Sequence, residues 1–211
     1  MGGGPAAWVS KVLAEDDFAT TQLGSNLIEI ERTPQSTFQL GVISSVRVGH
    51  QDVAQFLDGS SDPSFVVNIP REAIWTGEAI EALQNANIAF GGMGDIHRAI
   101  CETDPRTYVF REYAYVERRL RQHRSVTHIT RLFDRVWRVQ RGRGDVLDIA
   151  ISNEYDLTAD EVRTLWDRYG SFDALFHTNN LGRITTQARE AARDLEVELV
   201  ESRGLSDLLR R

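Results

Sequence analysis

The sequence predicts an α/β protein made of two tandem units with the same order of elements. The stretch TTQAREAARDLEVEL (residues 185–199) aligns without a gap on TGEAIEALQNANIAF (residues 76–90), at a constant offset of 109 residues. Apolar positions coincide across the two stretches, and so do the helix-opening threonines Thr76 and Thr185. The match continues on both sides with almost no gaps, so we expect an internal duplication rather than a single irregular α/β domain.

Each half reads in order as a helix, a β-hairpin, a helix, a strand, a helix, a strand and a helix. The first helices are expected around residues 8–13 and 115–120, where the offset slips to 107. The hairpins are LIEIERTPQSTFQLGVIS (residues 27–44) and VWRVQRGRGDVLDIAISN (residues 136–153). Both alternate apolar and polar residues on either side of a turn, which is expected at 33–36 and 141–144.

The remaining elements of each half follow at the same offset. Apolar residues three and four apart predict short helices in QDVAQFLDG (51–59) and DEVRTLWDR (160–168). The apolar runs FVVNIP (65–70) and ALFHTN (174–179) predict buried strands. The repeated stretches then give a helix and a short strand, and the last helices lie near residues 95–100 and 204–209. Asp104-Pro105 breaks any helix at the end of the first half, so the predicted units are residues 5–104 and 112–211.

Composition limits the class of protein. A chain of 211 residues can form two domains of about 100 residues. No apolar run approaches the roughly 20 residues that span a bilayer, and the first residues have no signal-peptide pattern. The single cysteine, Cys101, excludes a disulfide framework and a thiolate metal cluster. We therefore expect a cytoplasmic protein without a membrane partner.

Positive charge is concentrated at the start of the second half. Between Arg111 and Asp145, ten arginines stand against four acids, whereas the whole chain carries a net charge of −7. Such asymmetry is typical of a nucleic-acid-binding face, although solvated arginines that pair with acids elsewhere give the same pattern. Guanidinium groups bind phosphates, and an exposed tryptophan among them can stack on bases. The candidate nucleic-acid-binding residues lie on one helix and the hairpin that follows it: Arg118, Arg119, Arg121, Arg124, Arg135, Trp137, Arg138, Arg141 and Arg143.

A family resemblance is found in the second half, over residues 160–209. There a strand ends in Thr-Asn, a threonine opens the next helix, an AxxxA spacing follows, and a short apolar strand precedes a Gly-Leu helix start. This tail resembles that of the Mrr-like branch of the restriction-endonuclease-like, PD-(D/E)xK, superfamily. Through the repeat, the resemblance implies two restriction-endonuclease-like units, packed as an intrachain pseudo-dimer. It leaves a homo-oligomer open.

The resemblance also implies where chemistry would occur. Active members hold magnesium with an acid at the start of the hairpin and an acid or glutamine on its second strand, followed two residues later by a lysine. The second half offers Asp134 and Asp148 as catalytic candidates, but Ala150 stands at the lysine position and no lysine follows Lys11. Arg138 could replace the lysine only to orient an oxyanion or phosphate. The first half offers a similarly incomplete set: Asn26, Glu29, Glu31 and Gln39, with Gly41 at the lysine position.

No other motif predicts a cofactor or a bound metal. None of the five histidines has the spacing of a zinc site, and His177, which ends a predicted strand, is assigned to capping a turn. The glycine-rich stretch GGMGDIH (residues 91–97) lacks the ending of a phosphate-binding loop.

Three functions are consistent with this sequence. The leading hypothesis is a catalytically degenerate nuclease-fold protein that binds DNA, RNA or a protein partner without a cofactor. The resemblance places such a protein in defence, anti-defence or DNA repair. The first alternative is a divalent-metal-dependent nuclease that uses Mg²⁺ at an altered site containing Asp134 and Asp148. The second is an adaptor or inhibitor whose acidic half occupies a basic partner surface.

Overall fold

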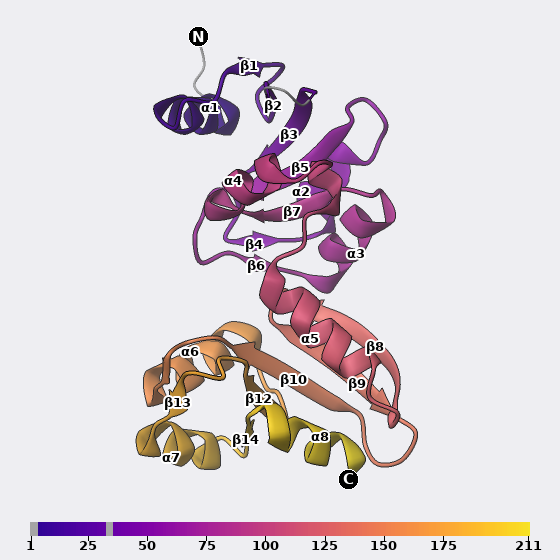
Figure 1. Cartoon of the computed structure of the whole chain (residues 1–211), viewed down its shortest axis with the longest axis vertical. Helices are drawn as coiled ribbons and strands as arrows, with labels where there is room; N and C mark the ends of the chain where they lie inside the picture. Colours follow the sequence, from indigo (N-terminus) through magenta and orange to yellow (C-terminus); the bar gives the residue numbers. More distant parts are fainter. Residues whose placement is uncertain (1–3, 33–35) are drawn as a thin grey trace. The chain divides into compact units, whose positions relative to one another are not determined.

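The computed structural model describes residues 4–32 and 36–211, so residues 33–35 of the first predicted turn lie outside the described residues. The chain divides into two compact units between Phe110 and Arg111. Each unit is a five-stranded mixed sheet with helices packed on it (Figure 1). The prediction of an α/β chain with two units is therefore confirmed.

The elements of unit 1 follow one another with short connections. In chain order they are α1 (Pro5–Glu15), β1 (Thr20–Gln22), β2 (Leu27–Ile30), β3 (Phe38–Ile43), β4 (Arg47–Val48), α2 (His50–Val53), a 3₁₀ turn η1 (Ala54–Phe56), β5 (Pro63–Asn68), β6 (Ile74–Trp75), α3 (Gly77–Asn85), β7 (Ala89–Gly92), α4 (Met93–Cys101) and a second 3₁₀ turn η2 (Pro105–Thr107).

The main sheet of unit 1 has the strand order β1-β2-β3-β5-β7. Strand β2 is antiparallel to both of its neighbours, whereas β3, β5 and β7 are parallel. Helices α1 and α4 cover one face, where Val9, Leu13 and Ile96 pack against Leu40 and Phe65. Helices α2 and α3 cover the other face around a second buried cluster of Val53, Val66, Trp75, Ile80 and Leu83.

The elements of unit 2 follow a similar order to those of unit 1. In chain order they are α5 (Arg111–Arg121), β8 (Val126–Phe133), β9 (Val136–Arg141), β10 (Leu147–Ser152), β11 (Asp156–Leu157), α6 (Ala159–Tyr169), β12 (Ala174–His177), β13 (Arg183–Ile184), α7 (Thr186–Asp194), β14 (Glu198–Val200) and α8 (Ser202–Arg210).

The main sheet of unit 2 has the order β14-β12-β10-β9-β8, which is the order of unit 1 read from the other edge. Strand β9 is antiparallel to both neighbours, and β10, β12 and β14 are parallel. Helices α5 and α8 cover one face, where Leu120 and Leu205 pack with Trp137, Ile149 and Phe176. Helices α6 and α7 pack against each other and supply further buried residues from Val162 to Ala192.

Local signals fix several helix boundaries. The hydroxyls of Thr76, Thr158 and Thr185 each accept a hydrogen bond from the backbone N–H three residues on, and so cap the starts of α3, α6 and α7. Gly170 ends α6 with φ at 82°, a backbone conformation that favours glycine. These caps lie where the aligned sequence stretches begin and end.

The sequence does not predict β1 and β8, so each expected hairpin is in fact part of a three-stranded antiparallel meander. In β8 only Ile129 is buried, because the outer face of this edge strand is open to solvent. Apolar alternation is therefore too weak to mark it. The parallel pairs β4–β6 and β11–β13 are also not predicted, since two residues per strand carry no measurable periodicity. Within the described ranges, no helix combines the length and the apolar character needed to cross a membrane.

Candidate functional site

A buried cluster of charged and hydroxyl groups lies in unit 2 where α5 begins and β10 and β12 end. Its acids are Glu112, in the first turn of α5, and Asp134, between β8 and β9, exposed by only 7% and 6%. Glu112 Oε2 accepts a hydrogen bond from Arg135 Nη1 at 3.1 Å, and its Oε1 accepts one from the Thr178 hydroxyl at 2.7 Å. The first acid is therefore bound by groups of its own unit.

Asp134 is held in the same way by tyrosines. Both of its carboxylate oxygens accept from the Tyr169 hydroxyl at 3.2 Å, and Oδ2 accepts from the Tyr113 hydroxyl at 3.5 Å. Burial raises the pKa of both tyrosines, and the negative charge of Asp134 raises it further. Burial opposes the charge on Arg135, but Glu112 nearby raises the pKa of this guanidinium above its ordinary value. We call these residues the carboxylate cluster: Glu112, Tyr113, Asp134, Arg135, Tyr169 and Thr178.

Ser152 and Glu161 extend this region at the end of β10. The Ser152 hydroxyl donates to Glu161 Oε1 at 3.2 Å, and the Ser152 carbonyl accepts from the Thr178 hydroxyl at 3.1 Å. Burial raises the pKa of Glu161, and Glu154 raises it further, although the bond from Ser152 lowers it. This carboxylate is therefore held in a less favourable environment than water.

The raised pKa of Glu161 gives a testable dependence of stability on pH. The pKa of Glu161 is higher in the folded chain than in the unfolded chain. The stabilising contribution of Glu161 is therefore present below the ordinary glutamate pKa of about 4.3, and it is lost as the pH rises through the pKa of the folded state. We expect Glu161→Gln to increase the free energy of unfolding at neutral pH, with the gain vanishing toward pH 4. Urea unfolding across this range measures it, with the exposed neighbour Asp160→Asn as control. A gain that stays constant down to pH 4 would contradict the assignment.

The two candidate catalytic acids do not form one site. In the β9–β10 register Asp148 is opposite Arg138, and Asp134 precedes Arg138 by four residues. At about 3.3 Å per strand residue, the two backbone positions lie roughly 13 Å apart. Asp148 instead receives two hydrogen bonds from Arg138, from Nε at 2.8 Å and Nη2 at 2.7 Å. The structure thus separates the carboxylates that the sequence pairs, and it commits Arg138 to Asp148.

Trp137 is a second correction, because the expectation that it is exposed is wrong. Its side chain is 1% exposed, since the face of β9 that carries Trp137 and Val139 is the face that α5 and α8 cover. The Arg131 guanidinium lies 4.5 Å from the Trp137 ring centroid and 4.1 Å from that of Tyr113. The indole N–H donates to Glu117 Oε1 at 3.4 Å. Trp137 is a core residue and cannot stack on a base.

The candidate arginines fall into two groups. Four are engaged within unit 2. Arg135 bonds Glu112, Arg138 bonds Asp148, Arg119 donates to the Ser202 carbonyl at 2.7 Å, and Arg141 donates to the carbonyls of Asp145 and Leu208. The other four are exposed, and their guanidinium groups make no hydrogen bond or salt bridge within residues 4–32 and 36–211. We call this second group the arginine face: Arg118, Arg121, Arg124 and Arg143.

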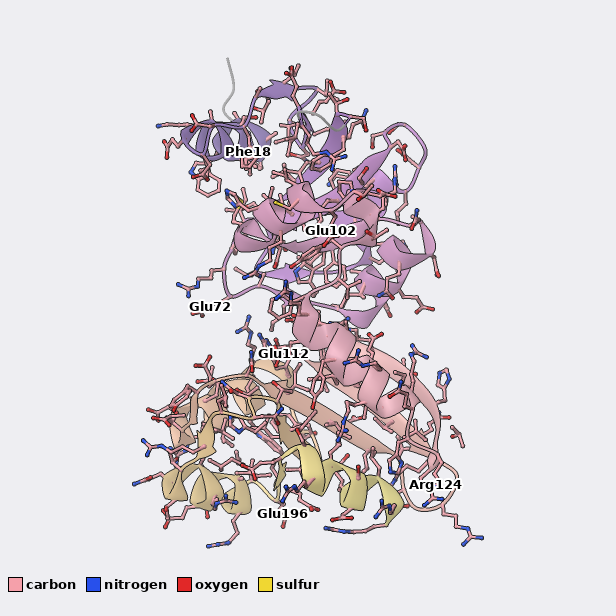
Figure 2. The ribbon with its side chains drawn as sticks, viewed as in Figure 1. Phe18, Glu72, Glu102, Glu112, Arg124 and Glu196 are labelled. Atoms are coloured by element: carbon pink, nitrogen blue, oxygen red, sulfur yellow. The ribbon has the colours of Figure 1, made fainter. Side chains whose placement is uncertain are left out.

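The arginine face gathers where α5 ends. Helix α5 stops at Arg121, so Arg124 lies in the turn after the helix rather than on it as expected. The Gly142 N–H donates to the Ser125 carbonyl at 2.9 Å, which places the β9–β10 loop with Arg143 beside this turn. Figure 2 labels Glu112 at the first turn of α5 and Arg124 beyond its last turn. The carboxylate cluster and the arginine face therefore lie at opposite ends of one helix.

The imidazole of His123 lies in the positive potential at this end of α5, which affects its pKa. Burial lowers the pKa of its imidazole, and Arg210, Arg124 and Arg119 lower it further by charge repulsion. Charges from the end of α5 and the end of α8 thus act on one point. Helix carboxyl ends favour such cations, because their unpaired carbonyls carry partial negative charge.

Unit 1 has a different arrangement at the aligned positions. Asp134 and His177 align with Ser25 and Asn68 at the offset of 109. The Asn68 side chain bonds the backbone N–H and carbonyl of Ser45, at 3.0 and 2.8 Å. Of the residues proposed from the sequence in this unit, Glu29 faces Gln39 across β2 and β3, and the Asn26 side-chain amide donates to Gln55 Oε1 at 2.9 Å.

Sequence reasoning missed most of the carboxylate cluster. Local sequence patterns do not indicate Glu112, Tyr169 or Thr178, because Tyr169 lies 35 residues from its partner Asp134, and Glu112 and Thr178 lie 66 residues apart. One usable signal was present. Glu112 lies four residues before Val116 and eight before Leu120, so it falls on the apolar stripe of its helix, where an acid requires a partner.

Metal binding would require free oxygens on these acids. Glu112 and Asp134 carry the right donor type for Mg²⁺, but Arg135, Thr178 and Tyr169 already occupy their oxygens. Among the residues that the structure describes, no group of three or more histidine, cysteine, aspartate or glutamate side chains is arranged to hold a metal ion.

Similarity to known proteins adds nothing to this geometry: no family model, curated protein or solved structure matches the chain. Two features of unit 2 are relevant to function. One is the carboxylate cluster, whose acids are bound by side chains of the same unit, and the other is the exposed arginine face.

Proposed function

We propose that this chain is a catalytically degenerate, duplicated restriction-endonuclease-like protein that binds nucleic acid through unit 2. The strand order supports the fold assignment. In both sheets the first three strands in chain order pair antiparallel with one another, and two more strands are parallel to the third. Only the second strand therefore has the opposite direction to the others. The same order of helices around both sheets supports duplication, together with the constant offset in sequence.

The observation that carries the binding proposal is the arginine face. Four exposed guanidinium groups, without a hydrogen-bond or salt-bridge partner among the described residues, lie at the end of α5 and in the neighbouring loop. An unpaired arginine keeps all of its donors for an external anion, and phosphates accept them in a bidentate manner. The sequence-independent attraction to a polyanion follows from several such contacts.

The carboxylate cluster supports the absence of nuclease chemistry in this proposal. A metal at Glu112 or Asp134 would have to displace Arg135 or Tyr169, and each displacement would leave a buried polar group without its partner. No lysine exists beyond Lys11 to activate a water molecule. The acids here therefore act as internal partners of the fold.

The experiment is a titration of labelled double-stranded DNA, single-stranded DNA and RNA at low and moderate salt, with and without Mg²⁺ and Mn²⁺. We expect binding that weakens as salt rises, with no cleavage product. Metal-dependent cleavage that is lost in Asp134→Asn would favour the nuclease instead. Absence of binding to all three ligands would overturn the proposal and favour the adaptor.

His123 provides a prediction about the location of the bound nucleic acid. A phosphate backbone at the arginine face would offset the charges of Arg124 and Arg210 and so favour the protonated imidazole. We expect the pKa of His123 to rise on addition of a saturating oligonucleotide. Titration of the imidazole resonances by NMR measures it, with the exposed His50 in unit 1 as internal control. A His123 pKa that does not change on saturation would place the nucleic acid elsewhere.

A further inference from the structure

A second feature of unit 2 lies outside the arginine face and the carboxylate cluster. A cavity of about 540 Å³ opens at the carboxyl ends of β12 and β14, against the start of α8. Its volume lies within the range of small-molecule sites. Its wall includes five polar side chains from β12, the loop after it, α7 and α8, none of which belongs to the arginine face or the carboxylate cluster: His177, Asn180, Arg189, Ser202 and Arg203.

His177 contributes a buried nitrogen without a partner to this wall. The side chain is 1% exposed, and its Nε2 lies 2.7 Å from the Glu154 carbonyl. Because a carbonyl only accepts, Nε2 is the donor in this bond, and in the tautomer that carries its proton on Nε2 the ring offers Nδ1 as an acceptor. This Nδ1 is buried and has no hydrogen-bond partner among the residues that the structure describes. An unmade hydrogen bond at a buried atom is costly, so a ligand donor at this point would be favoured.

The close approach of His177 to the neighbouring loop depends on a glycine. A Cβ atom on Gly182 would come 2.9 Å from His177 Cε1 and 2.4 Å from the Tyr155 carbonyl oxygen. The ring is thus fixed from two sides, by Gly182 and by its bond to Glu154. The role of turn cap that the sequence suggests for His177 accounts for Nε2 but leaves Nδ1 unexplained.

The start of α8 contributes donors to the same cavity. Glu201, its N-cap, makes no side-chain cap, and the intrahelical bonds begin with Leu205 N–H to the Glu201 carbonyl at 2.9 Å. The N–H groups of the first turn therefore lack intrahelical acceptors, and residues 202–204, which carry them, line the cavity. Ser202 is fixed there, since its hydroxyl donates to Asn180 Oδ1 at 2.7 Å and lies 3.2 Å from the Tyr115 hydroxyl.

The charge of the wall favours an anion at this end. Arg189 and Arg203 are exposed and make no hydrogen bond or salt bridge within the part of the chain that the structure describes. Two acids also line the cavity. Glu198 is occupied by Arg211 at 3.0 Å, and Glu201 is exposed at the helix start. Within the described chain, the cavity thus has two arginines whose guanidinium groups make no salt bridge, a helix N-terminus, and one acid without a salt bridge.

We propose that this cavity binds a phosphate monoester of nucleotide size. The phosphate lies at the start of α8 with Arg203 and Arg189, and a hydroxyl or N–H of the same ligand donates to His177 Nδ1. Both requirements are met by a nucleoside monophosphate, either free or at the phosphorylated end of a nucleic-acid strand. The proposal does not depend on the arginine face, because the residues of that face do not line this cavity.

The test is isothermal titration of the full chain with nucleoside 5′-monophosphates, the matching nucleosides and inorganic phosphate. We expect the monophosphates to bind, phosphate alone to bind more weakly and the nucleosides to give no heat. Removing a charged hydrogen-bond partner with Arg203→Ala should weaken binding about tenfold. His177→Asn should also weaken it, and it retains a side chain that can reach residue 154 as Asn68 reaches Ser45. Arg193→Ala, on the same helix as Arg189 but outside this cavity, should bind like the wild type.

Two results would overturn the proposal: no binding of any monophosphate, or binding that neither Arg203→Ala nor His177→Asn changes. An oligonucleotide with and without a 5′-phosphate separates the two sources of the ligand. Tighter binding of the phosphorylated form, lost in Arg203→Ala, identifies a strand end, whereas equal binding of the two forms together with mononucleotide binding identifies a free nucleotide. Loss of oligonucleotide binding in arginine-face variants leaves the mononucleotide result unaffected, so the two proposals can fail separately.

Discussion

Replacing Arg118, Arg121 and Arg124 together by alanine is expected to weaken nucleic-acid binding by about two orders of magnitude at moderate salt. The three guanidinium groups are exposed and have no partner in the described chain, so their removal costs the fold little. Each lost phosphate contact should also reduce the slope of log K against log salt by about one unit. Fluorescence anisotropy at salt concentrations between about 50 and 200 mM gives both quantities.

The matched control changes net charge by the same amount elsewhere. Arg71, Arg163 and Arg193 are also exposed, and their combined alanine variant should bind within a few-fold of the wild type. Equal loss of affinity in both triple variants would mean that the net charge of the protein, and not the arginine face, determines nucleic-acid binding. Unchanged affinity in the first variant would remove this face from the binding site altogether.

Trp137→Ala is expected to destabilise unit 2 by about 3 to 5 kcal/mol, the range for deletion of a large buried aromatic side chain. The indole is 1% exposed and packs between the sheet and α5, and its N–H bonds Glu117. Its loss would also leave the buried Arg131 guanidinium without one of its two aromatic faces. Urea unfolding followed by circular dichroism measures the change.

Two further tryptophan variants separate stability from binding. Trp8 is 48% exposed, so Trp8→Ala should cost less than about 1 kcal/mol. Trp137→Phe keeps an aromatic ring in the core and should bind nucleic acid like the wild type at temperatures where it is folded. A folded Trp137→Phe variant that has lost binding would show that the indole contacts the ligand after all, against its burial.

The carboxylate cluster is a buried group of polar residues whose acids are bound within the fold. Glu112 and Asp134 lie where strands end and a helix begins, a common place for sites in α/β proteins. Their partners are a guanidinium and hydroxyl groups, so each acid is satisfied within the fold. Removal of one partner would leave the other buried and uncompensated, which keeps such groups together.

The correspondence between the two units is clearest where local signals act. Threonines at the helix starts cap α3 and α7, and apolar phase along the chain places the buried strands β5 and β12. These features depend on residues within a few positions of each other, so they can be read from the chain. The edge strands β1 and β8 have one open face and few buried residues, so they are identified as strands only from their pairing in the sheet.

The sequence by itself determined the two-unit α/β class and the excess of arginine in the second unit. It also determined the order of the helices and of the strands other than β1, β8 and the two-residue pairs β4–β6 and β11–β13, because periodicity, capping and composition are local properties. Only the tertiary structure decided which face of β9 is covered, and hence that Trp137 is core. It also decided that Asp134 meets Tyr169 rather than Asp148, since strand register sets which distant residues become neighbours. Alternation along a strand defines two faces, but the position of the helices that pack on the sheet decides which face is buried and which is exposed to solvent.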